Sequence, residues 1–303
     1  MKKLALAFIF LAIAGAVAFY VLTIPSYLEE SELQAMSSGD AAKGERMFWA
    51  GGCASCHAAK GAKDDDKFEL GGGLELATPF GSFYAPNIST DTQNGIGDWT
   101  GAEFANAMMK GVSPNGSHYY PAFPYTSYTR MKIEDVADLW AFLQTLPAVS
   151  RENDRHDLPL VFRFRRGLGL WKLLFLTNKP IVEFSSEDPQ VKLGQYLTEG
   201  PAHCGECHTP RDFIGGMELS KWLGGGPAPE GEGKIPNITP DTSGIGSWTK
   251  EDIVFSLESG LTPDYDVFGG EMVSVQQNMA KLTPEDRQAI AAYLKAIPAV
   301  GSY

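Results

Sequence analysis

The chain begins with its longest apolar run. Lys2 and Lys3 precede residues 4–24, which carry no charged side chain. A helix of this length, at about 1.5 Å per residue, spans the hydrocarbon core of a bilayer. We predict a membrane-spanning helix within residues 1–28, with both lysines in the cytosol and the rest of the chain exported. The alternative is a secretory signal cleaved near residues 14–16, but the apolar run continues past that point, which favours the uncleaved anchor.

Beyond a polar tether at residues 29–39, apolar side chains recur at helical spacing in two matching places. In the first place they are Val136, Leu139, Trp140 and Leu143, and in the second they are Ile290, Tyr293, Leu294 and Ile297. This spacing puts one apolar stripe on each of two helices. No convincing run of alternating strand residues appears, so we predict an all-α fold.

Short motifs also return along the chain, which indicates an internal repeat. Pro-Asn-Ile stands at 86–88 and 236–238, and Gly-Ile-Gly-x-Trp-Thr stands at 95–100 and 244–249. We therefore predict two copies of one domain, at residues 40–150 and 188–303, joined by a linker at residues 151–187. In each copy we expect the asparagine of Pro-Asn-Ile to hold a turn.

The linker differs from the rest of the chain in charge. Between Val161 and Leu176 it mixes apolar residues with basic ones, namely Arg163, Arg165, Arg166 and Lys172. One interpretation is a segment that packs across both domains while its long basic side chains reach solvent. The other is a segment that docks on a partner or on a membrane surface. We favour the first.

Composition restricts the class of protein. The chain has 303 residues, of which 44% are apolar and 20% are charged. These values exclude a disordered chain, a collagen-like chain and a polytopic membrane protein. The net charge is −12, from 37 acidic and 25 basic residues. We expect no nucleic-acid partner, because such a partner requires a basic face.

The four cysteines form two Cys-x-x-Cys-His motifs, at residues 53–57 and 204–208. This spacing lets two thiols bond to one haem c while the adjacent histidine reaches the iron. The cysteines predicted to carry haem are Cys53, Cys56, Cys204 and Cys207, and the histidines predicted to bind iron are His57 and His208. A dithiol redox pair does not need the histidine, and zinc is usually held by two half-clusters, whereas each motif here lies in its own repeat. The sequence therefore predicts two covalently bound haem c groups.

The sixth iron ligand is expected on the loop before the last helix of each domain, where a methionine thioether raises the reduction potential. In the second domain this residue is Met272. The first domain has no methionine at the matching place, so Met131, His118, another ligand or none remain open, and Met131 is our first choice. We interpret Met279 and the methionine pair at 108–109 as packing residues.

These residues resemble the cytochrome c subunits of bacterial membrane-bound alcohol, gluconate and aldehyde dehydrogenases, and related dihaem cytochromes. The resemblance covers most of residues 40–303 and includes the segments 118–128 and 200–211. It implies two tandem class I cytochrome c domains after an N-terminal transmembrane helix, with haem on the motif cysteines and iron on the motif histidines. It also implies that a glycine of the first helix meets an aromatic residue of the last, as Gly44 with Phe142 and Gly194 with Tyr293.

Two departures from the family pattern bear on function. The dehydrogenase subunits usually carry three haem motifs, whereas this chain has two, and many have methionine where this chain has Phe123. The first departure bears on whether the partner is a dehydrogenase. The second bears on the reduction potential of the first haem. Near the second motif, Arg211 is a candidate partner for a haem propionate, and we interpret His203 as an ordinary surface histidine.

The sequence favours an electron carrier over an enzyme, held by one span in the bacterial inner membrane with its haem domains in the periplasm. The resemblance implies a dehydrogenase, a quinol-oxidising complex or another redox protein as donor. It implies a terminal oxidase, the quinone pool or another cytochrome as acceptor. The alternative is a haem enzyme. A dihaem peroxidase needs an open iron site, and a thiosulfate dehydrogenase uses a further cysteine as ligand, whereas haem attachment uses all four cysteines here.

Overall fold

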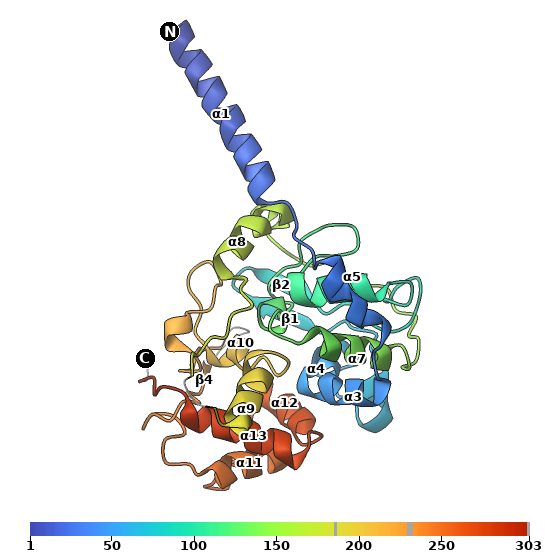
Figure 1. Cartoon of the computed structure of the whole chain (residues 1–303), viewed down its shortest axis with the longest axis vertical. Coiled ribbons are helices and arrows are strands. Elements are labelled where there is room, and N and C mark those ends of the chain that lie inside the picture. The colour runs from blue at the N-terminus through green and yellow to red at the C-terminus, as the bar shows by residue number, and fades with distance from the viewer. Residues whose placement is uncertain (185–186, 229–232, 302–303) are drawn as a thin grey trace.

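The computed structural model describes residues 1–184, 187–228 and 233–301. Its first helix, α1 (Lys2–Leu22), projects from a body that holds the remainder of the chain (Figure 1). None of the α1 residues, all of which the structure describes, is buried. The helix is long and apolar enough to cross a membrane, a test that an N-terminal signal sequence also passes.

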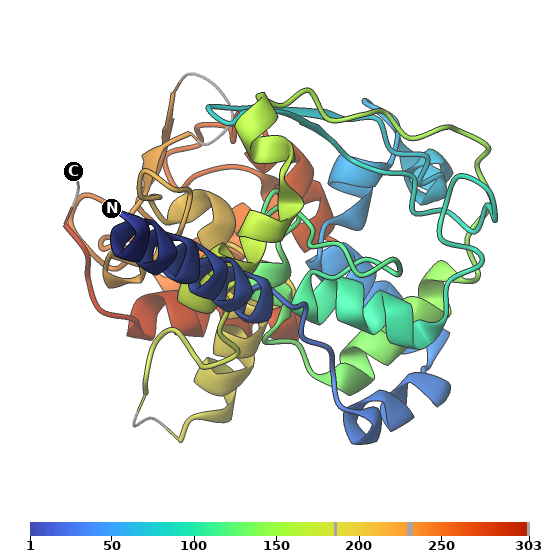
Figure 2. The ribbon, with the colours of Figure 1, turned by 90° about the horizontal axis from the view of Figure 1, so that it is seen from above.

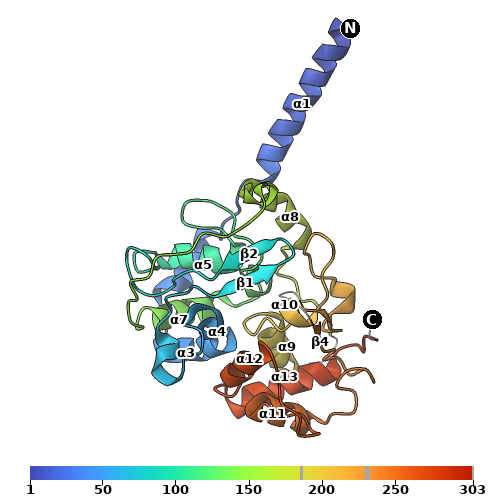
Figure 3. The same cartoon turned by 180° about the vertical axis from the view of Figure 1, so that it is seen from behind.

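The first repeat is a set of short helices around the first cysteine motif. Two small elements, α2 (Glu30–Leu33) and the 3-10 helix η1 (Gln34–Ser37), lead into it from α1. Its elements are α3 (Ala41–Ala50), α4 (Cys53–His57), η2 (Asp64–Phe68), β1 (Glu75–Thr78), β2 (Gly81–Tyr84), α5 (Gly101–Lys110), α6 (Tyr125–Tyr128) and α7 (Ile133–Leu143). Figure 3 shows α3, α4 and α7 side by side at one end of the body.

The second repeat follows the same order after a linker. The linker elements are η3 (Leu160–Arg163), η4 (Arg165–Gly167) and α8 (Leu168–Phe175). The elements of the second repeat are α9 (Pro189–Glu199), α10 (Gly205–His208), η5 (Leu219–Lys221), β3 (Gly226–Pro227), β4 (Lys234–Ile235), α11 (Lys250–Ser259), α12 (Met272–Met279) and α13 (Pro284–Ala296). They form the end of the body farther from α1 (Figure 1).

In each repeat the opening helix crosses the closing helix at a glycine. A Cβ on Gly44 of α3 would lie 1.9 Å from the carbonyl oxygen of Asp138 and 2.7 Å from the Cβ of Phe142, both on α7. A Cβ on Gly194 of α9 would lie 2.8 Å from the Cβ of Tyr293 on α13. Only a residue without a side chain allows this approach, so both expected glycine–aromatic pairs are confirmed.

Two short antiparallel hairpins accompany the helices in the described ranges. Strands β1 and β2 pair with Glu75 opposite Tyr84, and β3 pairs with β4. The prediction of a helical fold holds for the main elements but missed both hairpins. Strands of two to four residues are too short to show alternating polarity in the sequence.

The asparagines of the Pro-Asn-Ile motifs hold the turns that were expected of them. The side-chain oxygen of Asn87 accepts from the backbone N–H of Ser89 at 2.9 Å, and its amide donates to the carbonyl of Val149 at 2.7 Å. Asn237 makes the matching bonds to Thr239 and Val300, at 2.8 and 2.6 Å. Each asparagine therefore also ties the motif loop to the segment that follows the closing helix.

The linker packs across both repeats, as predicted. Its Trp171 donates from Nε1 to the carbonyl of Ile214 in the second repeat at 3.0 Å. Lys172, however, does not reach solvent, because its buried Nζ donates to the carbonyls of Lys110 and Gly111, both at 2.7 Å. These carbonyls end α5 and lack partners within the helix, so the ammonium replaces water there.

Replacing Gly44 with alanine is expected to destabilise the first repeat by about 1–3 kcal/mol, because the added methyl forces α3 away from α7. The measurement is the thermal unfolding midpoint of the haem-loaded protein by circular dichroism. Gly167→Ala is the control, since Gly167 has helical dihedral angles and open space where a Cβ would stand. Equal midpoints for the two variants would contradict the role assigned to Gly44.

Candidate haem sites

In the first motif, one ring nitrogen of the histidine is already hydrogen-bonded. His57 ends α4, and its Nδ1 lies 2.7 Å from the carbonyl oxygen of Pro86. A carbonyl only accepts, so Nδ1 carries the hydrogen and Nε2 keeps its lone pair for a metal. Pro86 belongs to the first Pro-Asn-Ile motif, which therefore supplies the group that orients the iron ligand.

The second motif repeats this geometry. His208 ends α10, and its Nδ1 lies 2.9 Å from the carbonyl oxygen of Pro236 in the second Pro-Asn-Ile motif. Desolvation by the surrounding protein lowers the pKa of both His57 and His208, which keeps each imidazole neutral as an iron ligand requires.

The surroundings of the motif cysteines favour sulfur atoms bonded to haem as thioethers over thiolates bound to a bare metal ion. Burial, with a smaller contribution from the neighbouring motif cysteine, raises the pKa of Cys53 and of Cys204 to about 12. Zinc requires thiolates, which such an environment disfavours. Within the described ranges, no group of three or more His, Cys, Asp or Glu side chains is placed to hold an ion. The residues fit haem c, which the four cysteines would hold with the iron on the two histidines.

The two motifs lie against each other at the interface between the repeats. Gly51, two residues before Cys53, offers its carbonyl oxygen to Nε2 of His203 at 3.2 Å and to the hydroxyl of Tyr128 at 3.3 Å. The rings of Tyr128 and His203 meet edge to face, with centroids 5.6 Å apart. His203 directly precedes Cys204, so the interpretation of His203 as an ordinary surface residue was wrong.

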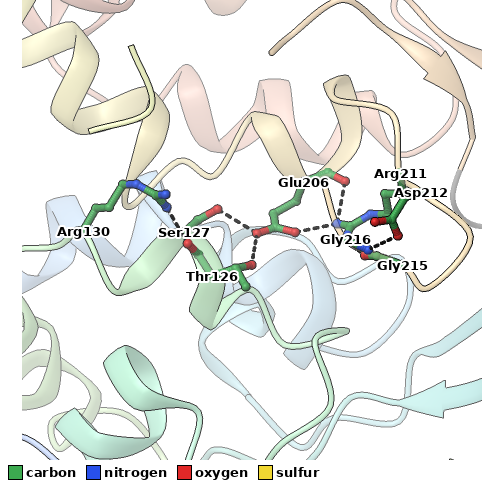
Figure 4. Close-up of polar contacts among 8 residues, drawn as sticks. All are labelled: Thr126, Ser127, Arg130, Glu206, Arg211, Asp212, Gly215 and Gly216. Carbon is green, nitrogen blue, oxygen red and sulfur yellow. Dashed lines mark hydrogen bonds and ion pairs between the residues drawn. The ribbon is translucent and has the colours of Figure 1, made fainter. Parts of the chain in front are cut away.

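Glu206, inside the second motif, is buried at this interface (Figure 4). Its carboxylate accepts hydrogen bonds from the hydroxyls of Thr126 and Ser127, both at 2.7 Å, which come from α6 of the first repeat. Arg211 completes the cluster with an ion pair at 2.5 Å. Burial alone would raise the pKa of Glu206, but the Arg211 charge and these hydrogen bonds outweigh it and hold the pKa below its ordinary value.

This cluster also changes the role expected of Arg211. Besides the ion pair, its guanidinium donates to the backbone carbonyl of Glu206 at 3.0 Å and to that of Gly215 at 2.9 Å. Arg211 therefore faces the carboxylate of the motif instead of standing ready for a haem propionate. A buried carboxylate needs a paired charge, and Arg211 is the cation that Glu206 reaches.

The interface is built from equivalent positions of the two repeats. Glu206 and Ser55 occupy the same place in their motifs, 151 residues apart, and so do Ser127 and Asn278 in the segments before the closing helices. Ser127 donates to Glu206 at 2.7 Å, and Asn278 donates from Nδ2 to Ser55 at 2.7 Å. Each motif is thus held by the other repeat at the same residue, as in an interface with two-fold symmetry.

A second pair of contacts follows the same relation. Arg46 of α3 donates to both carboxylate oxygens of Asp286 on α13, at 2.6 and 2.8 Å. Tyr196 of α9 donates to the carboxylate of Asp135 on α7. The two acids stand 151 residues apart, in the first turns of the closing helices. The opening helix of each repeat therefore binds the closing helix of the other.

The residues proposed as sixth ligands lie in different surroundings. Met272 is the first residue of α12 and is half-buried, whereas Met131 is buried in the core just before α7. His118 is also buried, but its Nε2 lies 3.0 Å from the carbonyl oxygen of Thr23 at the end of α1. Met279 is buried as expected of a packing residue.

Comparison with known proteins agrees with these sites. The family model for cytochrome c matches residues 41–147. A dihaem c-type cytochrome of Cereibacter sphaeroides is 52% identical over 288 residues, which cover 95% of both chains. The chain belongs to the dihaem c-type cytochromes. As a member of this family it carries two covalently bound haem c groups and transfers electrons.

More distant relatives are subunits of larger enzymes. The cytochrome c subunit of a quinone-dependent alcohol dehydrogenase from Gluconobacter oxydans is 35% identical over 85% of this chain and 55% of its own length. The cytochrome c subunit of a gluconate 2-dehydrogenase from Pantoea cypripedii is 35% identical over 85% of this chain and 59% of its own length. The dihaem cytochrome thus spans little more than half of these dehydrogenase subunits.

Replacing Glu206 with glutamine is expected to raise the reduction potential of the second haem by on the order of tens of millivolts, because a nearby carboxylate favours ferric iron. The measurement is a spectroscopic redox titration of the full haem-loaded chain. Ser55→Ala at the equivalent position removes a neutral partner and no charge, so both potentials should stay unchanged in that control. Because Glu206 also contacts α6 of the first repeat, a smaller shift of the first haem is expected. No shift of the second haem in E206Q, or a larger shift of the first, would contradict the assignment of Glu206 to the second haem site.

Proposed function

We propose that this dihaem cytochrome is a membrane-anchored relay that takes electrons from a dehydrogenase or a quinol-oxidising complex and passes them to a respiratory acceptor. Helix α1 holds it in the bacterial inner membrane by a single span, and residues 40–150 and 188–303 form two class I cytochrome c domains on the periplasmic side. The acceptor is a terminal oxidase, the quinone pool or another cytochrome.

The meeting of the two haem motifs in one interface is the observation that carries this proposal. Gly51 of one motif loop binds His203 of the other, and Ser55 and Glu206 each bind the opposite repeat. An electron carrier with two centres needs them in one rigid arrangement, whereas two independent enzymes on one chain do not. No substrate chemistry is assigned to the protein.

The relatives support a dehydrogenase as donor. Their names place cytochrome subunits of similar sequence with an alcohol dehydrogenase and a gluconate dehydrogenase. The present chain has two haem motifs and covers little more than half of those subunits. We propose a dehydrogenase that docks on the two haem domains as the donor.

We further propose Met272 as the sixth ligand of the second haem and Met131 as that of the first. Met272 begins α12, the helix that also supplies Asn278 to the interface. Met131 lies three residues after the end of α6, and its N–H donates to the carbonyl of Tyr128 at 2.9 Å, next to the first motif. Two irons with methionine ligands exchange electrons without binding substrate, which separates a carrier from a peroxidase.

The protein is expected to stay with the inner membrane after a wash in alkaline sodium carbonate, because only a spanning helix resists such a wash. Haem staining of the washed membranes provides the measurement. In unwashed membranes, an alcohol or gluconate should reduce its haems without an added mediator if a dehydrogenase is the donor. Haem found only in the supernatant would exclude the anchor, and haems reduced by quinol but by none of these substrates would exclude the dehydrogenase donor.

Replacing Met272 with leucine is expected to lower the potential of the second haem by on the order of 0.1 V, since the thioether favours ferrous iron. The first haem should change little. Redox titration of the full chain gives both potentials, and Met279→Leu, seven residues along the same helix, serves as the matched control with neither potential altered. Met131→Leu should lower the other potential. A Met272→Leu protein with two normal potentials would refute this ligand.

A further inference from the structure

The linker carries a group of large apolar side chains exposed to solvent. They are Leu160 (82% exposed), Val161 (73%), Phe164 (63%), Leu173 (62%) and Leu174 (71%). Single exposed apolar residues are common on soluble proteins, but several along one short segment indicate an interaction surface. We call these five residues the linker apolar face.

This face adjoins the end of the proposed membrane helix. Phe164 stacks on Phe19 of α1, with ring centroids 5.9 Å apart. The guanidinium of Arg166 donates to the hydroxyl of Thr23 at 2.8 Å and to the carbonyl of Tyr20 at 2.9 Å. Figures 1 and 3 show α8 at the foot of α1, and Figure 2 shows α1 projecting over the body when seen from above.

The junction between α1 and the body is fixed by buried contacts. Thr23 is fully buried, and its carbonyl accepts from Nε2 of His118 at 3.0 Å. The backbone N–H of Leu28 donates to the side chain of Asn106 on α5 at 2.8 Å. Because the chain is held on both sides of the turn after α1, the body cannot swing freely about the helix. The fold therefore fixes the position of the linker apolar face along the axis of α1.

The charge of the segment fits an anionic surface. Residues 161–176 contain no acidic residue, although the whole chain has a net charge of −12. Arg163 is exposed, whereas Arg165 and Arg166 are half-buried, with their guanidinium groups over the rings of Tyr120 and Tyr20. Basic side chains beside leucine and phenylalanine are the composition of segments that lie in the interface of a bilayer with anionic lipids.

We propose that the linker apolar face lies on the lipid surface beside α1, with the exposed Arg163 of η3 against anionic headgroups. The proposal rests on the proposed membrane anchor and extends it, because a second contact next to the helix fixes which side of the haem body faces the membrane. Lipid is the occupant because the face stands at the end of the spanning helix, where the bilayer surface begins. A partner protein or a second copy of this chain would have to bind where the lipid headgroups lie.

The test uses the full haem-loaded chain in lipid nanodiscs with one chain per disc. The native cysteines are bound to haem, so Leu173→Cys introduces a single reactive thiol on the face. The matched control is Val267→Cys, since Val267 is 69% exposed and lies between α11 and α12 in the repeat farther from α1 (Figure 1). The rate of modification by a water-soluble maleimide is measured in discs of phosphatidylcholine and in discs that also contain phosphatidylglycerol.

In the anionic discs, Leu173→Cys is expected to react about tenfold more slowly than Val267→Cys, because its thiol is buried in lipid. The difference should be smaller in neutral discs. Equal rates in anionic discs would overturn the proposal, and so would protection that appears only after other membrane proteins are added. Failure of the chain to elute with the discs would instead remove the anchor itself, so the two failures are distinguishable.

Discussion

The arrangement of the two repeats depends on the buried carboxylate of Glu206. A charge removed from water is tolerated only where ion pairs and hydrogen bonds replace its hydration. Arg211 comes from the same repeat, but Thr126 and Ser127 come from the other, at 2.7 Å each. Separating the repeats would leave the carboxylate without two of these three partners. The haem motif itself is therefore part of the domain interface, and changes in one repeat act directly on the haem site of the other.

Within each repeat, the constraint is the orientation of the iron ligand. The carbonyls of Pro86 and Pro236 hold Nδ1 of His57 and His208, at 2.7 and 2.9 Å, and proline is useful here because its fixed dihedral angle sets the direction of the chain. Asn87 and Asn237 then tie the same loops to the ends of the closing helices. The Pro-Asn-Ile motif of each repeat thus connects the motif histidine to the two helices that cross at Gly44 or Gly194.

Sequence reasoning found what local patterns encode. The haem motifs and the helix stripes repeat within the chain, and each shows its spacing directly, whereas the glycine–aromatic pairs were implied by the family resemblance. The interface was missed because its contacts join residues 61 to 240 positions apart, and no periodicity marks such a contact. One signal was present. Glu206 and Ser55 are polar residues at the same place in a motif that must lie against a haem, which indicates a polar partner outside the repeat.

Charge distribution connects the interface to the membrane. The chain is strongly acidic overall, and the stretch between Val161 and Leu176 is basic. At an anionic bilayer the net negative charge of the body would oppose contact and the basic stretch would favour it, so under the proposed lipid contact both effects act toward one orientation. Phe164 and Arg166 bind this stretch to α1, and Lys172 binds it to the end of α5. Under the proposed lipid contact, the linker that joins the two repeats would also fix the orientation of both of them at the membrane.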